Sequence, residues 1–187
     1  MSDATKISTA KPGVAGAVHI AAADTALPSN ATSTLSAAFD ALGYVSEDGI
    51  TIADSPESDP VKEMGGQVVD TINKGRNTTI TFTLIESLNV DVLKAVYGDA
   101  NVTGTLSTGI SISVGTDDMP EQVWVFDMVL KGGASKRIVV PAGKISELGE
   151  TVYKGDEVVG YEITIMALLD SSGKTHYQYI EGASASV

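Results

Sequence analysis

The 187-residue sequence contains no cysteine, so it can form neither a disulfide nor a thiolate metal site. This composition is compatible with a reducing compartment such as the cytoplasm. Aromatic residues are also scarce, with one Trp, three Phe and six Tyr, which leaves little surface for stacking on sugar rings. Because no run of eighteen apolar residues occurs, the sequence predicts no membrane-spanning helix.

Basic residues are in the minority, with 12 Lys and Arg against 24 Asp and Glu, and the formal net charge is −12. Eight of the acids fall between Asp40 and Asp70, where Lys62 is the single base. A surface of this sign repels nucleic acid rather than holding it.

The stretch from Val14 to Ala23 follows two lysines and superficially imitates a secretory signal. Asp3 lies in the supposed basic region, and Gly16 and His19 interrupt an apolar run that is mostly Ala. We therefore expect no signal peptide.

Residues that carry chemistry are sparse. The two histidines, His19 and His176, have no ligand-like neighbours, and neither a nucleophile elbow nor a phosphate-binding loop motif occurs. Four acids could in principle surround Ca²⁺, but they lack the glycine-centred twelve-residue pattern of helix-loop-helix sites: Asp54, Glu57, Asp59 and Glu63. We predict no catalytic, cofactor-binding or metal site. A hydrolase using two of the many carboxylates is a third functional hypothesis, after the two given below.

The apolar content of 43% is enough for one packed domain, which we place at residues 35–170. Residues 1–34 are rich in Ala, Ser, Thr and Gly and are predicted to form an extended N-terminal arm with little core. Residues 171–187 are predicted to form a C-terminal arm with one short strand, His176 to Ile180.

Apolar periodicity predicts seven or eight strands and one helix. Thr78 to Ile85 alternates between apolar residues and threonine, as in a half-buried strand. Val123 to Leu130 is apolar almost throughout, which indicates that both of its faces are covered. A helix is expected at Asn89 to Tyr97, capped by Asn89 and ended by Gly98. Further strands are expected at Val68 to Ile72, Ile110 to Val114, Arg137 to Val140 and Tyr161 to Leu169. The predicted fold is mainly β: a β-sandwich or partly closed barrel with one flanking α-helix.

One segment predicts a tight hairpin. Leu42 to Ser46 and Ile50 to Ile52 have strand character on either side of Glu47-Asp48-Gly49, and Asp-Gly is a strong hairpin-turn signal. The next segment, Ala53 to Gly66, contains two prolines, five charged residues and a Gly-Gly pair, and it reads as a long acidic loop.

Four segments in this order resemble the major tail tube proteins of long-tailed, siphovirus-type bacteriophages. They are Leu42 to Ile52, Thr71 to Glu86 with the helix behind it, Arg137 to Ile145, and Tyr161 to Ala167. The resemblance extends over residues 14–180 and depends on the order and spacing of the segments together.

The resemblance implies a structural protein without enzymatic activity or cofactor. Six copies would join their sheets into a hexameric ring, and stacked rings would form the tail tube of the virion. Its lumen would surround the tape-measure protein and later pass the genomic DNA without binding it specifically. A tail terminator would be a further partner, no membrane would be involved, and assembly would occur in the bacterial host cytoplasm.

Within this resemblance, the long loop and the N-terminal arm are the candidates for contacts between rings, because they are long and poor in core residues. The predicted contact residues are Ala53, Asp54, Pro56, Glu57, Asp59, Pro60, Lys62 and Glu63. The alternative hypothesis is an Ig-like surface-binding or decoration module of a virion or a cell. Such a stand-alone module has no need of a long acidic loop and two arms.

Overall fold

The computed structural model describes residues 2–183, which are 48% strand and 9% helix. The prediction of a mainly β fold with one flanking helix is confirmed, and the sheet does not close into a barrel. Residues 184–187 of the expected C-terminal arm and Met1 of the N-terminal arm lie outside the described residues. The strands are β1 (Ala10–Pro12), β2 (Val18–Ala22), β3 (Asp40–Ala41), β4 (Val45–Lys62), β5 (Val68–Leu84), β6 (Val102–Thr105), β7 (Gly109–Ile112), β8 (Gln122–Leu130), β9 (Ser135–Leu148), β10 (Tyr161–Ala167) and β11 (Tyr177–Glu181).

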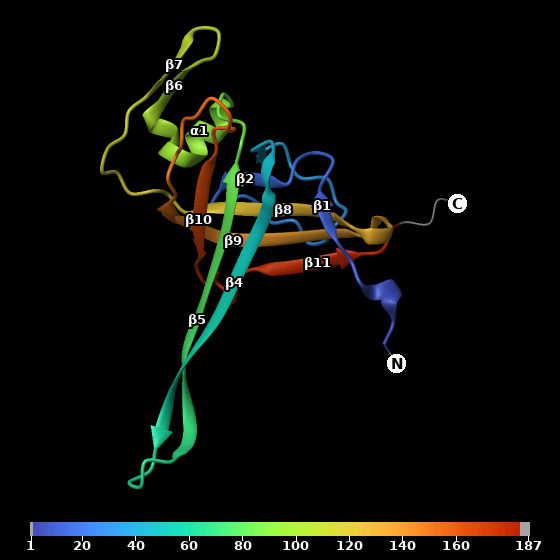
Figure 1. The fold of residues 1–187 in the computed structure, drawn as a ribbon, viewed down its shortest axis with the longest axis vertical. Coiled ribbons are helices and arrows are strands. Elements are labelled where there is room, and N and C mark those ends of the chain that lie inside the picture. Colours follow the sequence, from blue (N-terminus) through green and yellow to red (C-terminus); the bar gives the residue numbers. More distant parts are fainter. Residues whose placement is uncertain (1, 184–187) are drawn as a thin grey trace.

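Nine strands form one sheet in the order β3-β2-β8-β9-β10-β5-β4, with β1 paired to β8 and β11 paired to β9. All of these pairings are antiparallel. In Figure 1 β8, β9 and β11 run across the view, whereas β10, β5 and β4 run along it. The sheet therefore folds over on itself into two layers with the core between them. Strands β6 and β7 form a separate two-stranded hairpin.

Strand β9 belongs to both layers. Its first part pairs with β8 and β11, and its last part, from Gly143 to Leu148, pairs with β10. Gly143 lies directly under the ring of Trp124, where a Cβ would come within 2.5 Å of the indole Cδ1. The indole Nε1 donates a hydrogen bond to the Gly143 carbonyl at 3.4 Å. Glycine is needed here because any side chain would displace the largest residue of the core.

The core is centred on Phe82, whose ring lies edge-on to Trp124 and Phe126 at centroid distances of 5.8 and 5.4 Å. The predicted alternation of the inner half of β5 is confirmed: Ile80, Phe82 and Leu84 are buried, and the threonines between them are half-buried. Edge-to-face aromatic pairs contribute about 0.5–1.5 kcal/mol each beyond the burial of their area.

Helix α1 (Val90–Tyr97) covers one end of this core. The Asn89 side chain accepts a hydrogen bond from the Asp91 N–H at 3.0 Å, and the Gly98 N–H closes the last turn on the Lys94 carbonyl. The sequence-based helix and both of its predicted ends are therefore confirmed.

The other face of the sheet carries a second, smaller cluster. Ala21, Val123, Val125 and Val139 are buried there, and Leu35 and Phe39 pack over them together with Tyr177 and Tyr179 of β11. This explains the almost fully apolar stretch of β8, whose alternate residues serve two different clusters. The expectation that residues 1–34 contribute little core is wrong for β2, because Val18, Ile20 and Ala21 are buried in the sheet. The sequence analysis missed this strand because its apolar residues are few and mostly small, although short runs of such residues can pack in a sheet.

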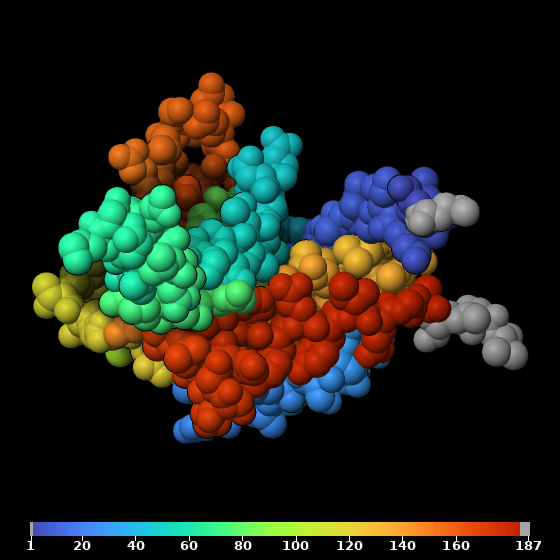
Figure 2. Space-filling view, turned by 90° about the horizontal axis from the view of Figure 1, so that it is seen from below, coloured from blue at the N-terminus to red at the C-terminus, as the bar shows by residue number. Residues whose placement is uncertain are grey.

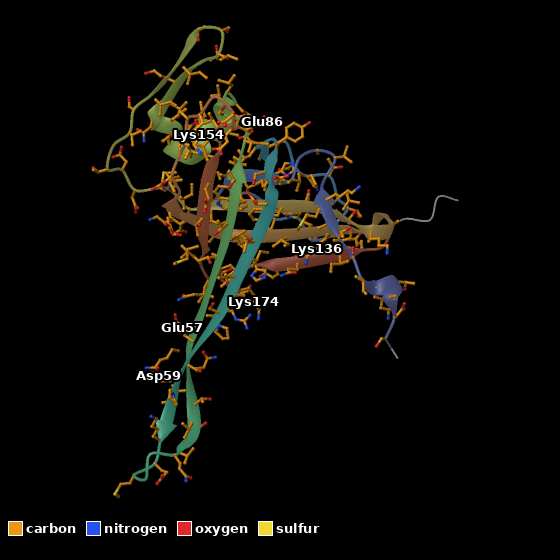
Figure 3. The ribbon with its side chains drawn as sticks, in the orientation of Figure 1. Glu57, Asp59, Glu86, Lys136, Lys154 and Lys174 are labelled. Atoms are coloured by element: carbon orange, nitrogen blue, oxygen red, sulfur yellow. The ribbon has the colours of Figure 1, made fainter. Side chains whose placement is uncertain are left out.

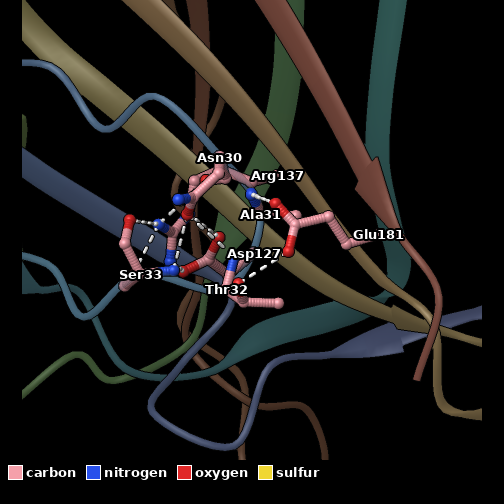
Figure 4. A network of polar contacts seen from close by, with 7 residues as sticks. All are labelled: Asn30, Ala31, Thr32, Ser33, Asp127, Arg137 and Glu181. Carbon is pink, nitrogen blue, oxygen red and sulfur yellow. Dashed lines mark hydrogen bonds and ion pairs between the residues drawn. The ribbon is translucent and has the colours of Figure 1, made fainter. Parts of the chain in front are cut away.

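A buried polar network holds residues 30–33 against the sheet (Figure 4). Arg137 makes a two-pronged ion pair with Asp127, at 2.6 and 2.8 Å, and its third nitrogen donates to the Ser33 carbonyl at 2.8 Å. Glu181 of β11 accepts hydrogen bonds from the Ala31 N–H at 3.1 Å and from the Thr32 hydroxyl at 2.6 Å. The Arg137 guanidinium is almost fully enclosed, so its charge depends on Asp127 for compensation.

His19 lies beside this network and is only 5% exposed. Its Nδ1 makes no hydrogen bond within residues 2–183. Burial lowers the pKa of His19 below its usual 6.5, and Asp127 and the Ala15 carbonyl only partly oppose this effect, while Arg137 adds to it. The folded protein therefore favours the neutral imidazole.

Truncation of the central aromatic ring is expected to be costly. Replacing Phe82 with Ala should lower the free energy of unfolding by about 3–5 kcal/mol, because it removes apolar area and leaves a cavity between two aromatic rings. Thr83→Ala, one residue further on the opposite face, should lower it by less than about 1 kcal/mol. Urea denaturation of both variants measures the difference, and equal losses would contradict the assigned core.

His19 should make stability depend on pH. Since its pKa is lower in the folded than in the unfolded chain, the unfolded chain takes up the proton first as the pH falls below about 6.5. The free energy of unfolding should therefore fall between about pH 7 and pH 5.5. His19→Leu should flatten this part of the profile and His176→Gln should not, as measured by urea denaturation at each pH. A wild-type profile that is flat over this range would refute the assignment.

Candidate functional site: a projecting hairpin

Strands β4 and β5 form a long hairpin whose outer half extends beyond the body of the molecule (Figure 1). The register runs from Val45 opposite Leu84 to Lys62 opposite Val68. In the outer half, residues 53–77, every side chain except that of Val61 is exposed. Figure 2 views the hairpin from its tip, where it stands clear of the N-terminal segment and beside the C-terminal region.

The tight hairpin predicted at Asp48-Gly49 is wrong. Strand β4 is continuous there, and the ladder moves from the Val45–Leu84 pair directly to the Ile50–Phe82 pair. The intervening residues form a bulge, in which Gly49 adopts a φ of 76°. Asp-Gly supplies the positive φ that a bulge needs as readily as the one that a hairpin turn needs, so the local signal was real but ambiguous.

The predicted loop from Ala53 to Gly66 is also wrong, because Ala53 to Lys62 continue β4 and pair with β5. The true turn follows at residues 63–67, where the Glu63 carboxylate accepts hydrogen bonds from the N–H groups of Gly65 and Gln67. These hydrogen bonds also lower the pKa of Glu63. Prolines and acids have low strand propensity, and pairing with a neighbouring strand overrode it.

The structure places all eight predicted contact residues on the hairpin: seven on the outer half of β4, and Glu63 at the turn. Three of its acids, of which Glu57 and Asp59 are labelled in Figure 3, pair with bases or an amide of β5. Asp59 pairs with Lys74 at 3.1 Å, Asp54 pairs with Arg76 at 3.0 Å, and Glu57 accepts a hydrogen bond from Asn77 at 2.6 Å. Exposed pairs of this kind stabilise by about 0–1 kcal/mol each, so they align the two strands more than they hold the fold together.

The four acids considered for Ca²⁺ are spread along the hairpin, each with its own partner. Within residues 2–183, no cluster of three or more His, Asp or Glu side chains has a geometry suited to a metal ion.

Sequence reasoning missed the apolar residues of the hairpin. Met64 at the turn is fully exposed, and Val68, Val69 and Ile72 of β5 are more than half exposed. The sequence did indicate a strand at Val68 to Ile72. Because the strand that pairs with it was predicted to be a loop, these apolar residues were not recognised as part of a projecting hairpin. Large apolar side chains grouped on an otherwise polar projection are typical of a contact surface.

A groove lies at the base of the hairpin. It is lined by Asp54 and Pro56 of β4, by Asn73, Gly75 and Arg76 of β5, and by Lys174, Thr175 and His176 of the segment between β10 and β11. The Thr78 hydroxyl connects the two sides through hydrogen bonds to Asp54 at 3.0 Å and to Thr175 at 3.2 Å. The hairpin is thus tied to the body by buried polar contacts, while its outer half is free to meet another molecule.

Removing exposed apolar side chains from the hairpin should affect association and not folding. We expect Val69→Thr combined with Ile72→Thr to change the free energy of unfolding by less than about 1 kcal/mol, because both side chains already face solvent. Self-association, measured by sedimentation velocity, should weaken. A control with Leu106→Thr and Val158→Thr removes equally exposed apolar residues elsewhere and should leave self-association unchanged.

Within residues 2–183 no helix has the length and apolar character needed to cross a membrane. A search of curated proteins gives no match to this sequence. Comparison with protein families matches residues 4–186 to the family described as "Phage tail tube protein", which is nearly the whole chain. The match includes the two-layered sheet, the flanking helix and the projecting hairpin. This chain belongs to the phage tail tube protein family.

Proposed function

We propose that this structural subunit of a phage tail tube closes into hexameric rings, and that the rings stack into a conduit that delivers the phage genome. Family membership supports the first part of this statement, that the protein is a structural subunit of the virion tail. The hexamer and the passage of DNA are our proposal. Its assembly in the bacterial host cytoplasm, around a tape-measure protein and up to a tail terminator, belongs to the same proposal.

The sheet supports closure of a ring. Among the described residues, four strands of this sheet pair with a single neighbour and so have an unpaired edge: β3 and β4 at the two ends of the order, and β1 and β11 beside it. Exposed edges favour pairing with another chain, and a cyclic arrangement of copies would satisfy every edge in turn. The net charge of −12 would let DNA slide through the lumen because it disfavours binding of the phosphate backbone.

The observation that carries the proposal is the outer hairpin. Residues 53–77 bury almost nothing against their own chain, yet they are held in one direction by a paired ladder. A rigid projection with exposed apolar residues is suited to contact with a neighbouring ring. We propose that the eight predicted residues from Ala53 to Glu63 take part in this contact, together with the exposed N-terminal residues 2–9.

Truncating the hairpin tests this role. Ser55 and Asn77 lie opposite each other, so the segment Pro56–Arg76 can be replaced by Asn-Gly, a two-residue hairpin turn. The shortened chain should fold normally, because every buried residue is retained. It should form no tubes, or tubes about tenfold fewer than wild type, in negative-stain electron microscopy.

The matched control changes the turn of a different projection without altering its length. Replacing Leu106-Ser107 at the β6–β7 turn with Asn-Gly changes another exposed loop and should leave tube yield unchanged. Tubes of normal length and yield from the truncated hairpin would overturn the contact role. Wild-type protein that forms only monomers and captures a ligand would favour the decoration module instead.

A further inference from the structure

The outer hairpin has two long edges of unpaired backbone within the described residues. Strand β4 is the last strand of the sheet, so its far edge is open. Strand β5 pairs with β10 only from Thr78 to Leu84, so its residues 68–77 are open on the side away from β4. A strand from another molecule could in principle add to either edge.

Two prolines close the β4 edge. In an antiparallel pair, alternate residues direct their N–H and C=O groups toward the partner strand and away from it. Pro56 and Pro60 lie opposite Arg76 and Thr71, and they have no N–H to give. Because they are four residues apart, their nitrogens face the same side, which is the open one. The β4 edge therefore lacks two of the donors that an added strand would need.

The β5 edge retains its donors. Thr71 lies opposite Pro60, so its N–H faces away from β4, and it is held by the carboxylate of the preceding Asp70 at 2.8 Å. Arg76 lies opposite Pro56, so its N–H also faces away from β4. Gly75 lies at a register shift, opposite Glu57, and its N–H is bonded to the Asn73 side chain at 2.8 Å. The Asp70 cap of Thr71 is an exposed side chain that can rotate away, whereas a proline blocks its position permanently. Residues 68–77 contain no proline.

The side chains have the same asymmetry. Three large, exposed apolar residues are on β5: Val68, Val69 and Ile72. The only aliphatic residues on the outer half of β4, prolines aside, are Ala53 and the half-buried Val61. The groove at the base of the hairpin is lined by Asn73, Gly75 and Arg76 of β5 and also by Asp54 and Pro56 of β4, and it opens where β5 extends beyond its pairing with β10.

We infer that the hairpin accepts a strand from a second copy of this chain along β5, at residues 68–77, and that Pro56 and Pro60 exclude pairing along β4. The inference rests on the proposed function, because a tail tube is built from copies of its subunit and the occupant is therefore another such copy. Because the β4 edge is closed, the strand added along β5 has to come from a different part of the second copy, and such a head-to-tail contact between unlike surfaces is the geometry that rings and stacks require. Pairing of β5 with β5 of the second copy would instead be symmetric and would end the assembly.

A matched pair of proline substitutions tests the inference. Thr71→Pro removes an edge donor of β5 that the β4 ladder does not use. Ser58→Pro does the same on β4, where two neighbouring donors are already absent. Tube yield, scored by negative stain and by pelleting, should fall about tenfold for Thr71→Pro and stay at the wild-type level for Ser58→Pro. Urea denaturation of both monomers identifies any loss of folding.

A second measurement avoids substitutions altogether. Hydrogen exchange of wild-type tubes compared with wild-type monomer should show new protection in peptides covering 68–77 and none in peptides covering 53–60. If wild-type protein forms tubes, then equal tube yields for the two proline variants, or protection confined to residues 53–60, would overturn the inference. If wild-type protein forms no tubes or rings at all, the proposed function itself fails.

Discussion

The paired ladder between β4 and β5 is the constraint on which the rest of the structure depends. One pair of strands serves two purposes: its inner half carries Ile80, Phe82 and Leu84 into the core, and its outer half extends into solvent. The outer half has no core of its own, so its direction is set by hydrogen bonds that continue from the buried half. An isolated two-stranded hairpin is marginally stable in water, and this one is stable because a third strand, β10, and the aromatic cluster support its base.

A self-assembling β protein has to keep edges available to its own copies without exposing them to everything else. The charge distribution of the hairpin contributes to this. Two of its five acids pair with bases across the strands, which compensates part of the negative charge of the projection. At physiological salt the Debye length is about 8 Å, so the repulsion between acidic copies is largely screened beyond that distance.

Much of the fold could be predicted from periodicity. The alternating threonines of β5, the capped helix and the two-sided strand at Val123 all carry signals that local sequence determines. The hairpin could not be predicted, because its geometry depends on which segments pair. Asp48-Gly49 satisfies a bulge as well as a turn, and Pro56 and Pro60 are tolerated in a strand only on an edge that faces away from the partner. The predicted contact residues were assigned to a loop, whereas the structure places most of them on a strand. The exposed apolar residues of the partner strand were overlooked.

The network around Arg137 has a consequence for the timing of folding. Glu181 binds the backbone of Ala31 across a separation of 150 residues, so this contact closes almost the entire chain into one loop. During synthesis, at about 5–20 residues per second, the contact cannot form until the chain has been extended from Ala31 to beyond Glu181. Until then the second face of the sheet lacks both β11 and a firmly held covering segment. A subunit whose second face is completed only after β11 has been made presents that finished face to other copies only from this stage onward.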